Sequence, residues 1–221
     1  MAALSERLPL PRVLAFASIG MPLAAIGLPM AVFVAPMYAE DLALGTATVG
    51  LILMLLRFWD LGTDPVMGWL VDAKPTRRGR IKHWIIGSVP VLMLGGFFVY
   101  MPMGETVSPL YLAFWLAVLW LGFTMLQTPY ASWAPMIAAD YDDRSRLFLW
   151  REILNTFTLI ALLIIPSILA IYFDYGVREQ VLVMGIILLI SLPMTVGLAV
   201  LAVPDTPPDP NDEHTGFSFS E

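Results

Sequence analysis

Six long stretches of mostly apolar residues fill this chain of 221 residues, and they limit its fold more than any other feature. A helix needs about 20 mostly apolar residues to cross the hydrocarbon core of a bilayer. The six stretches reach that length, and they lie near residues 12–37, 47–71, 83–103, 109–138, 147–172 and 178–203. The sequence therefore predicts an all-α integral membrane protein, with six transmembrane helices bundled within residues 1–203.

The composition excludes most other classes of protein. Hydrophobic residues make up 58% of the chain and charged residues only 14%, whereas soluble domains average about 25% charged residues. The net charge of −6 argues against a nucleic-acid partner, because phosphate binding needs a basic surface. There is no cysteine, and the two histidines, His83 and His214, are isolated from each other. We therefore expect neither an enzyme nor a bound cofactor.

Basic residues are distributed unevenly among the connections. The connections on the far side from the N-terminus hold only Arg178, and nine Lys and Arg residues fall on the near side: Arg7, Arg12, Lys74, Arg77, Arg78, Arg80, Lys82, Arg144 and Arg146. Cytoplasmic connections carry such an excess of basic residues. The bias predicts a multi-pass protein of the cell membrane (plasma or inner membrane) with both termini cytoplasmic. Residues 204–221, with five acidic residues and no Lys or Arg, would form an acidic cytoplasmic tail.

Prolines interrupt the first apolar stretch at a regular interval. Pro22, Pro29 and Pro36 are seven residues apart, so they return to nearly the same face of a helix. Each proline removes a backbone donor, which a membrane helix tolerates only where protein or water replaces the lost partner. The pattern predicts a bent helix that lines a cavity, with ordinary transmembrane proline as the alternative.

The second apolar stretch contains three charged residues within a segment long enough to cross the bilayer. Arg57, Asp60 and Asp64 are three and four residues apart and so share one helix face, with Thr63 one position off it. A charge at the centre of a membrane helix costs about 2.5–3.5 kcal/mol, so such residues usually pair or serve a function. One guanidinium balances only one carboxylate, so the second must be protonated or hold a cation such as Na⁺ through the oxygens of Asp60 and Asp64. The alternative is a buried charge network that only positions helices.

Two further groups of charges have alternative interpretations. Arg151 lies a few residues inside the fifth stretch, where it could donate to a solute, pair with Glu152 or extend to the interface. The connection after the second stretch is short and strongly basic. It could form a charge network that clamps one conformation, or act only as a topology signal; the residues concerned are Asp72, Arg77, Arg78 and Arg80.

Four motifs in the chain resemble one known family of transporters. They read RxxDxxTDPxxGW at residues 57–69, TRxGRxKxW at 76–84, QTPYxxWxP at 127–135 and RxRLxxxR at 144–151. With these motifs the chain resembles the glycoside–pentoside–hexuronide:cation symporter family of the major facilitator superfamily, from about residue 12 to residue 203. The resemblance implies that the six spans form the N-terminal six-helix bundle of a major facilitator transporter.

The resemblance also implies roles for particular residues. The positions at which the family binds its coupling cation correspond to Asp60, Thr63, Asp64 and Thr124. Arg151 falls on an arginine that contacts sugar in a member of the family, and Gln127 falls on a solute-binding acid of the fourth span. An uncharged amide at Gln127 disfavours galactosides, and so does the lack of an acid in the first span, where the positions nearest to the family's acid are Met21 and Pro22. A less polar or differently charged solute therefore remains open beside a sugar.

From these motifs we expect a symporter that couples a solute, such as a sugar or glycoside, to Na⁺ or H⁺ by alternating access. A major facilitator binds its substrate between two six-helix halves, so the chain would present one half, as a fragment or as a unit that dimerises. Its tail would then begin the linker to the other half. The expected partners are the solute, the coupling cation, lipid, and a second half or a second copy. The alternative is a non-transporting orphan half or membrane scaffold whose charges serve packing.

Overall fold

The computed structural model describes residues 7–73, 81–138 and 140–204, and within these ranges every regular element is helical. The elements are α1 (Leu10–Ala17), α2 (Gly20–Ile26), the π-helical segments η1 (Met30–Val34) and η2 (Met37–Asp41), α3 (Thr46–Ala73), α4 (Lys82–Tyr100), α5 (Pro109–Ile137), α6 (Tyr141–Phe173) and α7 (Val177–Ala202). Six helical stretches are long and apolar enough to cross a membrane. The predicted all-α fold with six spans is therefore confirmed, while the predicted acidic tail lies almost entirely outside the described residues.

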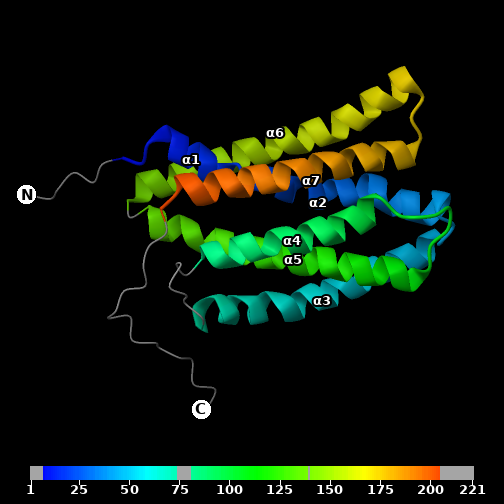
Figure 1. Ribbon diagram of the computed structural model, residues 1–221, viewed down its shortest axis with the longest axis horizontal. Helices are drawn as coiled ribbons and strands as arrows, with labels where there is room; N and C mark the ends of the chain where they lie inside the picture. Colours follow the sequence, from blue (N-terminus) through cyan, green and yellow to red (C-terminus); the bar gives the residue numbers. More distant parts are fainter. Residues whose placement is uncertain (1–6, 74–80, 139, 205–221) are drawn as a thin grey trace, which may run out of the picture.

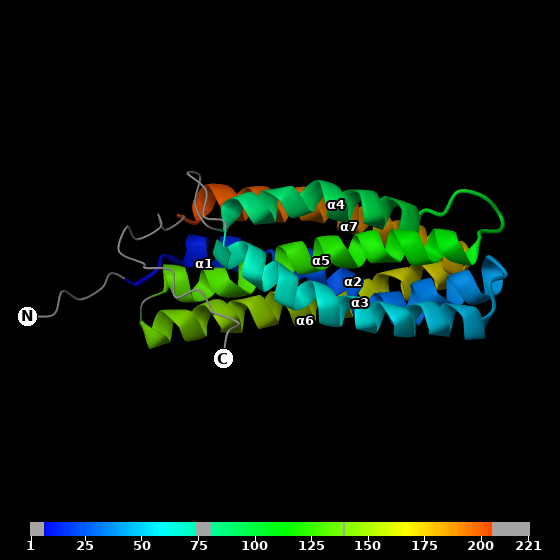
Figure 2. The same cartoon turned by 90° about the horizontal axis from the view of Figure 1, so that it is seen from below.

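Successive spans run in opposite directions along the long axis of the bundle (Figure 1). The start of α1 and the end of α7 lie at one end of the bundle, together with the end of α3, the start of α4 and the junction of α5 with α6 (Figures 1 and 2). The α4–α5 and α6–α7 connections lie at the opposite end. The two ends of the described chain are consequently on the same side of the bundle.

The first span is irregular, as its prolines predict. α1 and α2 are separate short helices, and the backbone leaves helical geometry at Gly27, where φ is −75° and ψ is −106°. Pro29 and Pro36 immediately precede the two π-helical segments. Wider helical turns of this kind often appear where the regular ladder of hydrogen bonds is interrupted. The prolines do not line the charged cavity described below, so the structure supports the interruption of this span without assigning the prolines to that cavity.

Tyrosine hydroxyl groups replace backbone donors that the irregular spans lack. Pro29 has no N–H with which to bond the carbonyl oxygen of Ala25, and the hydroxyl of Tyr100 donates to that oxygen at 2.8 Å. In the same way the hydroxyl of Tyr111 donates to the carbonyl oxygen of Phe98 at 2.9 Å. Because the bilayer core offers no water, a buried carbonyl needs such a partner. These bonds fix the first span and α5 against the end of α4.

Glycines allow α4 to pack closely against α5 and α7. A Cβ atom added to Gly95 of α4 would lie 2.7 Å from backbone atoms of Leu119, and one added to Gly185 of α7 would lie 2.6 Å from the Cβ atom of Tyr100. Small residues at contacts are typical of membrane helices, which associate through close packing. The side chains of α5 that face away from α4 are therefore held on a rigid support.

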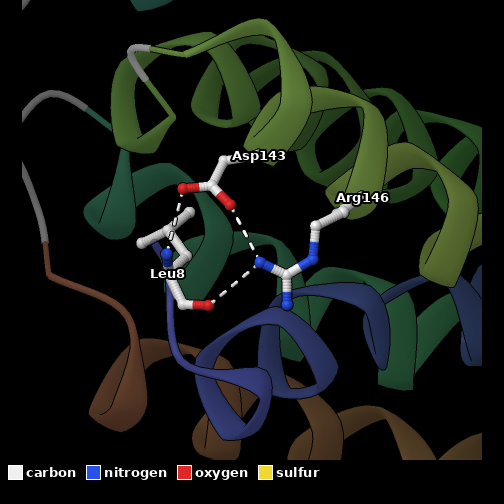
Figure 3. A network of polar contacts seen from close by, with 3 residues as sticks. All are labelled: Leu8, Asp143 and Arg146. Atoms are coloured by element: carbon white, nitrogen blue, oxygen red, sulfur yellow. Dashed lines mark hydrogen bonds and ion pairs between the residues drawn. The ribbon is translucent and has the colours of Figure 1, made fainter. Parts of the chain in front are cut away.

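A buried carboxylate links the segment that leads into α1 to the beginning of α6 (Figure 3). Asp143, only 6% exposed, accepts hydrogen bonds from the backbone N–H of Leu8 and from Nη1 of Arg146, both at 2.9 Å. Arg146 Nη1 also donates to the carbonyl oxygen of Leu8 at 3.4 Å. The helix begins at Tyr141 rather than near residue 147 as expected, because acidic residues in its first turn are favourable at a helix N-terminus.

The two outermost helices, α3 and α6, leave most of their surface uncovered. Only 17% of the most apolar part of α3 and 11% of that of α6 are buried, against at least 33% for the other four spans. They lie at opposite edges of the bundle (Figure 1). The helix with the acids thus packs mainly on α5, contacts η2 as well, and leaves the rest of its surface open.

Candidate functional site

A cavity of about 500 Å³ lies between α3 and α5, and charged side chains line it. The lining residues are Arg57, Asp60 and Asp64 of α3 with Trp120, Phe123, Thr124, Gln127, Thr128, Ala131 and Ser132 of α5. The α3 residues follow the three-and-four spacing that places them on one helix face. The structure therefore brings together both predicted acids, their arginine, the predicted span-four threonine and the predicted solute-binding glutamine around one space.

Asp64 is fixed across the cavity by a hydroxyl group of α5. Thr124, which is 3% exposed, donates from Oγ1 to Oδ1 of Asp64 at 3.1 Å. A hydroxyl oxygen that donates one hydrogen bond still has lone pairs for another partner. The pair therefore links α3 to α5 and leaves oxygens of both side chains able to bind a cation.

Asp60 and Arg57 form only a loose ion pair. Nη1 of Arg57 lies 3.7 Å from Oδ2 of Asp60, whereas a charge-assisted hydrogen bond measures about 2.7–2.9 Å. The Arg57 side chain is 74% exposed and that of Asp60 is 18% exposed. The other oxygen of Asp60, Oδ1, is buried and has no hydrogen-bond partner. Since buried polar atoms are normally satisfied, this carboxylate favours a proton or a cation beside it.

The donor set around the cavity suits a hard cation or a proton. It contains two carboxylates and the hydroxyl groups of Thr124, Thr128 and Ser132 against one guanidinium, so one negative charge remains unbalanced. Oxygen ligands of this kind are those that hard cations prefer. Thr63, expected to join them, does not line the cavity; its hydroxyl donates to the carbonyl oxygen of Asp60 at 3.4 Å. That bond to its own helix is a common alternative for threonine, and the sequence pattern could not exclude it.

Arg151 lies apart from this cavity. Its guanidinium carbon is 5.1 Å from the ring centroid of Tyr130 on α5, and its Cγ would lie 3.5 Å from a Cβ atom added to Gly20 of α2. Within the described part of the chain it has no ion pair or hydrogen bond, so the alternative of local pairing with Glu152 is not observed. Among the residues that the structure describes, Arg151 therefore has an aromatic contact but no acidic partner, and it lies between α2, α5 and α6 and not beside Gln127 in the lining of the cavity.

The expected charge clamp falls outside what the structure describes. Asp72 belongs to α3, but its side chain is not among the described parts, and neither are Arg77, Arg78 and Arg80. An aromatic side chain that the motifs did not indicate, Trp120, also lines the cavity, and its ring lies 5.4 Å from the guanidinium carbon of Arg57. Its spacing could have indicated it, because Trp120, Thr124 and Gln127 follow the four-and-three interval of one helix face.

The fold and the cavity together define a class of protein: a polytopic membrane protein with ionisable residues gathered between its spans. A sequence profile of the family described as MFS/sugar transport protein matches residues 15–215. The chain therefore belongs to this transporter family of the major facilitator superfamily, which is not a family of enzymes.

Relatives of the chain are named as symporters or carriers. The chain is 28% identical over 120 residues to the putative glycoside/cation symporter YagG of Escherichia coli (strain K12), covering 53% of this chain and 26% of the relative. It is 30% identical over 143 residues to the glucuronide carrier protein homolog of the same organism, covering 62% and 31%. It is 32% identical over 137 residues to the sodium-dependent lysophosphatidylcholine symporter 1-B of Danio rerio, covering 56% and 25%. The chain thus matches between 25% and 31% of the length of these curated relatives.

Proposed function

We propose that this chain is the cation-binding six-helix unit of a symporter that moves a solute together with Na⁺ or H⁺ by alternating access. The observation that supports this most directly is the buried Oδ1 of Asp60, which has no partner in a cavity where two carboxylates face one guanidinium. A network that served packing alone would gain from pairing that oxygen. The cation-dependent names of relatives agree with the proposal.

The proposed cation ligands are oxygens of Asp60, Asp64 and Thr124. A bound cation would neutralise the excess negative charge and draw the carboxylates of α3 toward the hydroxyl of Thr124 on α5. It would therefore favour one arrangement of these two helices. If the solute binds that arrangement better, cation and solute each raise the affinity of the other by the same factor. This mutual increase in affinity is what couples the movement of the solute to that of the cation.

The proposed solute contacts are Gln127 and Arg151. Gln127 lines the cavity one turn from Thr124, and Tyr130, over which Arg151 lies, is one turn further along α5. An amide binds hydroxyl groups without charge, whereas an unpaired guanidinium suits an acidic group. Relatives are named for glycosides, glucuronides and lysophosphatidylcholine, and the last two carry such a group. We propose a sugar or glycoside with an acidic substituent.

A second six-helix unit would cover the open face of α3. Arg57 is largely exposed there, and Asp64 is exposed as well. Three ionised groups facing hydrocarbon would cost about 8–10 kcal/mol on insertion scales. We propose that a partner half or a second copy of the chain packs against this face. We further propose a cell-membrane location with the start of α1 and the end of α7 cytoplasmic (Figure 1). The start of α6 lies at the same end of the bundle, and basic residues gather in these helix beginnings: Arg7 and Arg12 at α1, Arg144 and Arg146 at α6.

Solute binding with and without sodium tests the proposal. The full chain in lipid nanodiscs is titrated with 4-nitrophenyl β-D-glucuronide, in NaCl and in choline chloride, at several pH values. We expect tighter binding with Na⁺ or at lower pH, and weaker binding of the matching glucoside. Glucuronide affinity that is independent of both ions would contradict coupling. A folded chain that binds neither sugar derivative and no cation would instead support a scaffold.

A further inference from the structure

Side chains on two neighbouring turns of α5 contact charged side chains of α3, one of them an acid and the other an arginine. Thr124 donates to the carboxylate of Asp64 at 3.1 Å. One turn earlier, the ring of Trp120 lies 5.4 Å from the guanidinium carbon of Arg57. An aromatic ring attracts a guanidinium at this distance through its quadrupole. These contacts with α5 therefore keep the guanidinium of Arg57 apart from the carboxylate of Asp64.

The orientation of the Trp120 ring is itself fixed. Phe123, which is three residues further along α5 and also lines the cavity, contacts it with ring centroids 5.1 Å apart and an interplanar angle of 73°. Edge-to-face contacts of this kind are a preferred arrangement of aromatic pairs. The face of Trp120 thus offers Arg57 a stable position within the cavity.

Arg57 has a competing partner on its own helix. Asp60 is three residues away, a spacing at which side chains on a helix can form a direct ion pair. The observed distance of 3.7 Å shows that the pair is not closed into a hydrogen bond, and Oδ1 of Asp60 is left without a partner. The guanidinium of Arg57 thus contacts both the ring of Trp120 and Oδ2 of Asp60.

We infer that Trp120 is a positioning residue that restrains Arg57 from closing on Asp60 and thereby raises the affinity of the site for its coupling cation. The inference rests on the proposed function. Without the ring, Arg57 would form a closed pair with Asp60, and a cation would have to displace it. A cation–π contact at a partly exposed site has a strength that corresponds to about a two- to fivefold change in affinity. Trp120 acts through Arg57 and does not itself bind the cation.

Sodium titrations of six proteins test this positioning role. The full chain, its variants Trp120→Leu, Trp120→Phe and Trp115→Leu, and the Arg57→Gln variant with and without Trp120→Leu are placed in nanodiscs. Thermal stability is followed against NaCl with choline chloride as the balance. A cation that binds only the folded protein stabilises it by RT ln(1 + c/Kd), where c is the cation concentration, so the rise of the melting temperature with NaCl concentration reports the apparent affinity. Trp115, on the same helix, stacks on Phe98 at 4.0 Å and does not line the cavity, so it controls for general loss of packing.

The expected result is an apparent Na⁺ affinity about two- to fivefold weaker in Trp120→Leu, with Trp120→Phe between it and the wild type. Trp115→Leu lowers the melting temperature without changing that affinity. In an Arg57→Gln background, Trp120→Leu causes no further loss, because the restrained group is absent. Wild-type affinity in Trp120→Leu, or an equal loss in the Arg57→Gln background, overturns the inference and leaves the proposed function intact. A wild-type chain that responds to neither Na⁺ nor pH overturns both.

Discussion

Replacing Tyr100 by phenylalanine should destabilise the protein through a carbonyl group of a different span. Tyr100 is 1% exposed, and its hydroxyl donates to the carbonyl oxygen of Ala25 at 2.8 Å. In a regular helix that oxygen would accept from the N–H four residues later, but this residue is Pro29. Removal of the hydroxyl therefore leaves a buried carbonyl oxygen without its donor.

The expected loss of stability follows from the cost of leaving this carbonyl group without a hydrogen bond. A buried polar group left unsatisfied costs about 1–3 kcal/mol. Hydrogen bonds between membrane helices contribute less, about 0.6 kcal/mol on average and about 1.7 at most, because the unfolded chain also finds partners in the membrane. We expect Tyr100→Phe to lower the free energy of unfolding by about 1–1.5 kcal/mol. For a chain of this size, the melting temperature should fall by roughly 2–6 °C.

The assay is thermal melting in detergent, with two comparisons that isolate the mechanism. Tyr141→Phe is the control, because Tyr141 is 82% exposed and its hydroxyl should contribute little. Pro29→Ala restores an N–H that can bond Ala25, so Tyr100→Phe should have less than half its effect in that background. An equal effect in both backgrounds, or no effect of Tyr100→Phe at all, would refute the explanation that the hydroxyl replaces the donor missing at Pro29.

Three other predictions concern packing, topology and the solute. Gly95→Ala should lower the free energy of unfolding by about 1–3 kcal/mol because the new methyl group would overlap α5 backbone, whereas Gly87→Ala on the same helix meets nothing within 4 Å and should not. Equal melting temperatures would contradict this. Because the chain has no cysteine, an impermeant maleimide added to intact cells should label Glu105→Cys but not Ser145→Cys, and the reverse pattern would invert the orientation. Arg151→Gln should weaken glucuronide binding at least tenfold and leave Na⁺ stabilisation unchanged, so loss of both, or of neither, would argue against a solute role.

The sequence was sufficient to predict those features that depend on the geometry of a single helix. The six spans follow from apolar length, and the grouping of Asp60 and Asp64 follows from the helical repeat, which fixes neighbours three and four residues apart. Contacts between helices could not be derived in this way. The position of Trp120 against Arg57 depends on how closely α3 packs on α5. The position of Arg151 against Tyr130, and not in the cavity lining, depends on how α6 packs on α5 and α2.

The sequence also could not show which of several possible partners a polar group bonds. The hydroxyl of Thr63 could turn toward the acids or toward its own backbone, and the helical repeat does not distinguish the two. The bond between Leu8 and Asp143 joins residues 135 positions apart, so no pattern in either segment indicates it. There the sequence showed only that Asp143 and Arg146 carry opposite charges three residues apart.

A calorimetric Na⁺ titration of the full chain shows whether the unbalanced carboxylate of the cavity binds the coupling cation. The wild type, Asp64→Asn and the control Asp41→Asn, an exposed acid outside the cavity, are compared at several pH values. Asparagine keeps an oxygen for the hydroxyl of Thr124 but removes the excess charge. We predict Na⁺ binding or proton uptake in the wild type and in Asp41→Asn, and neither in a folded Asp64→Asn. Retention of wild-type cation and pH dependence by Asp64→Asn would contradict cation binding by that carboxylate.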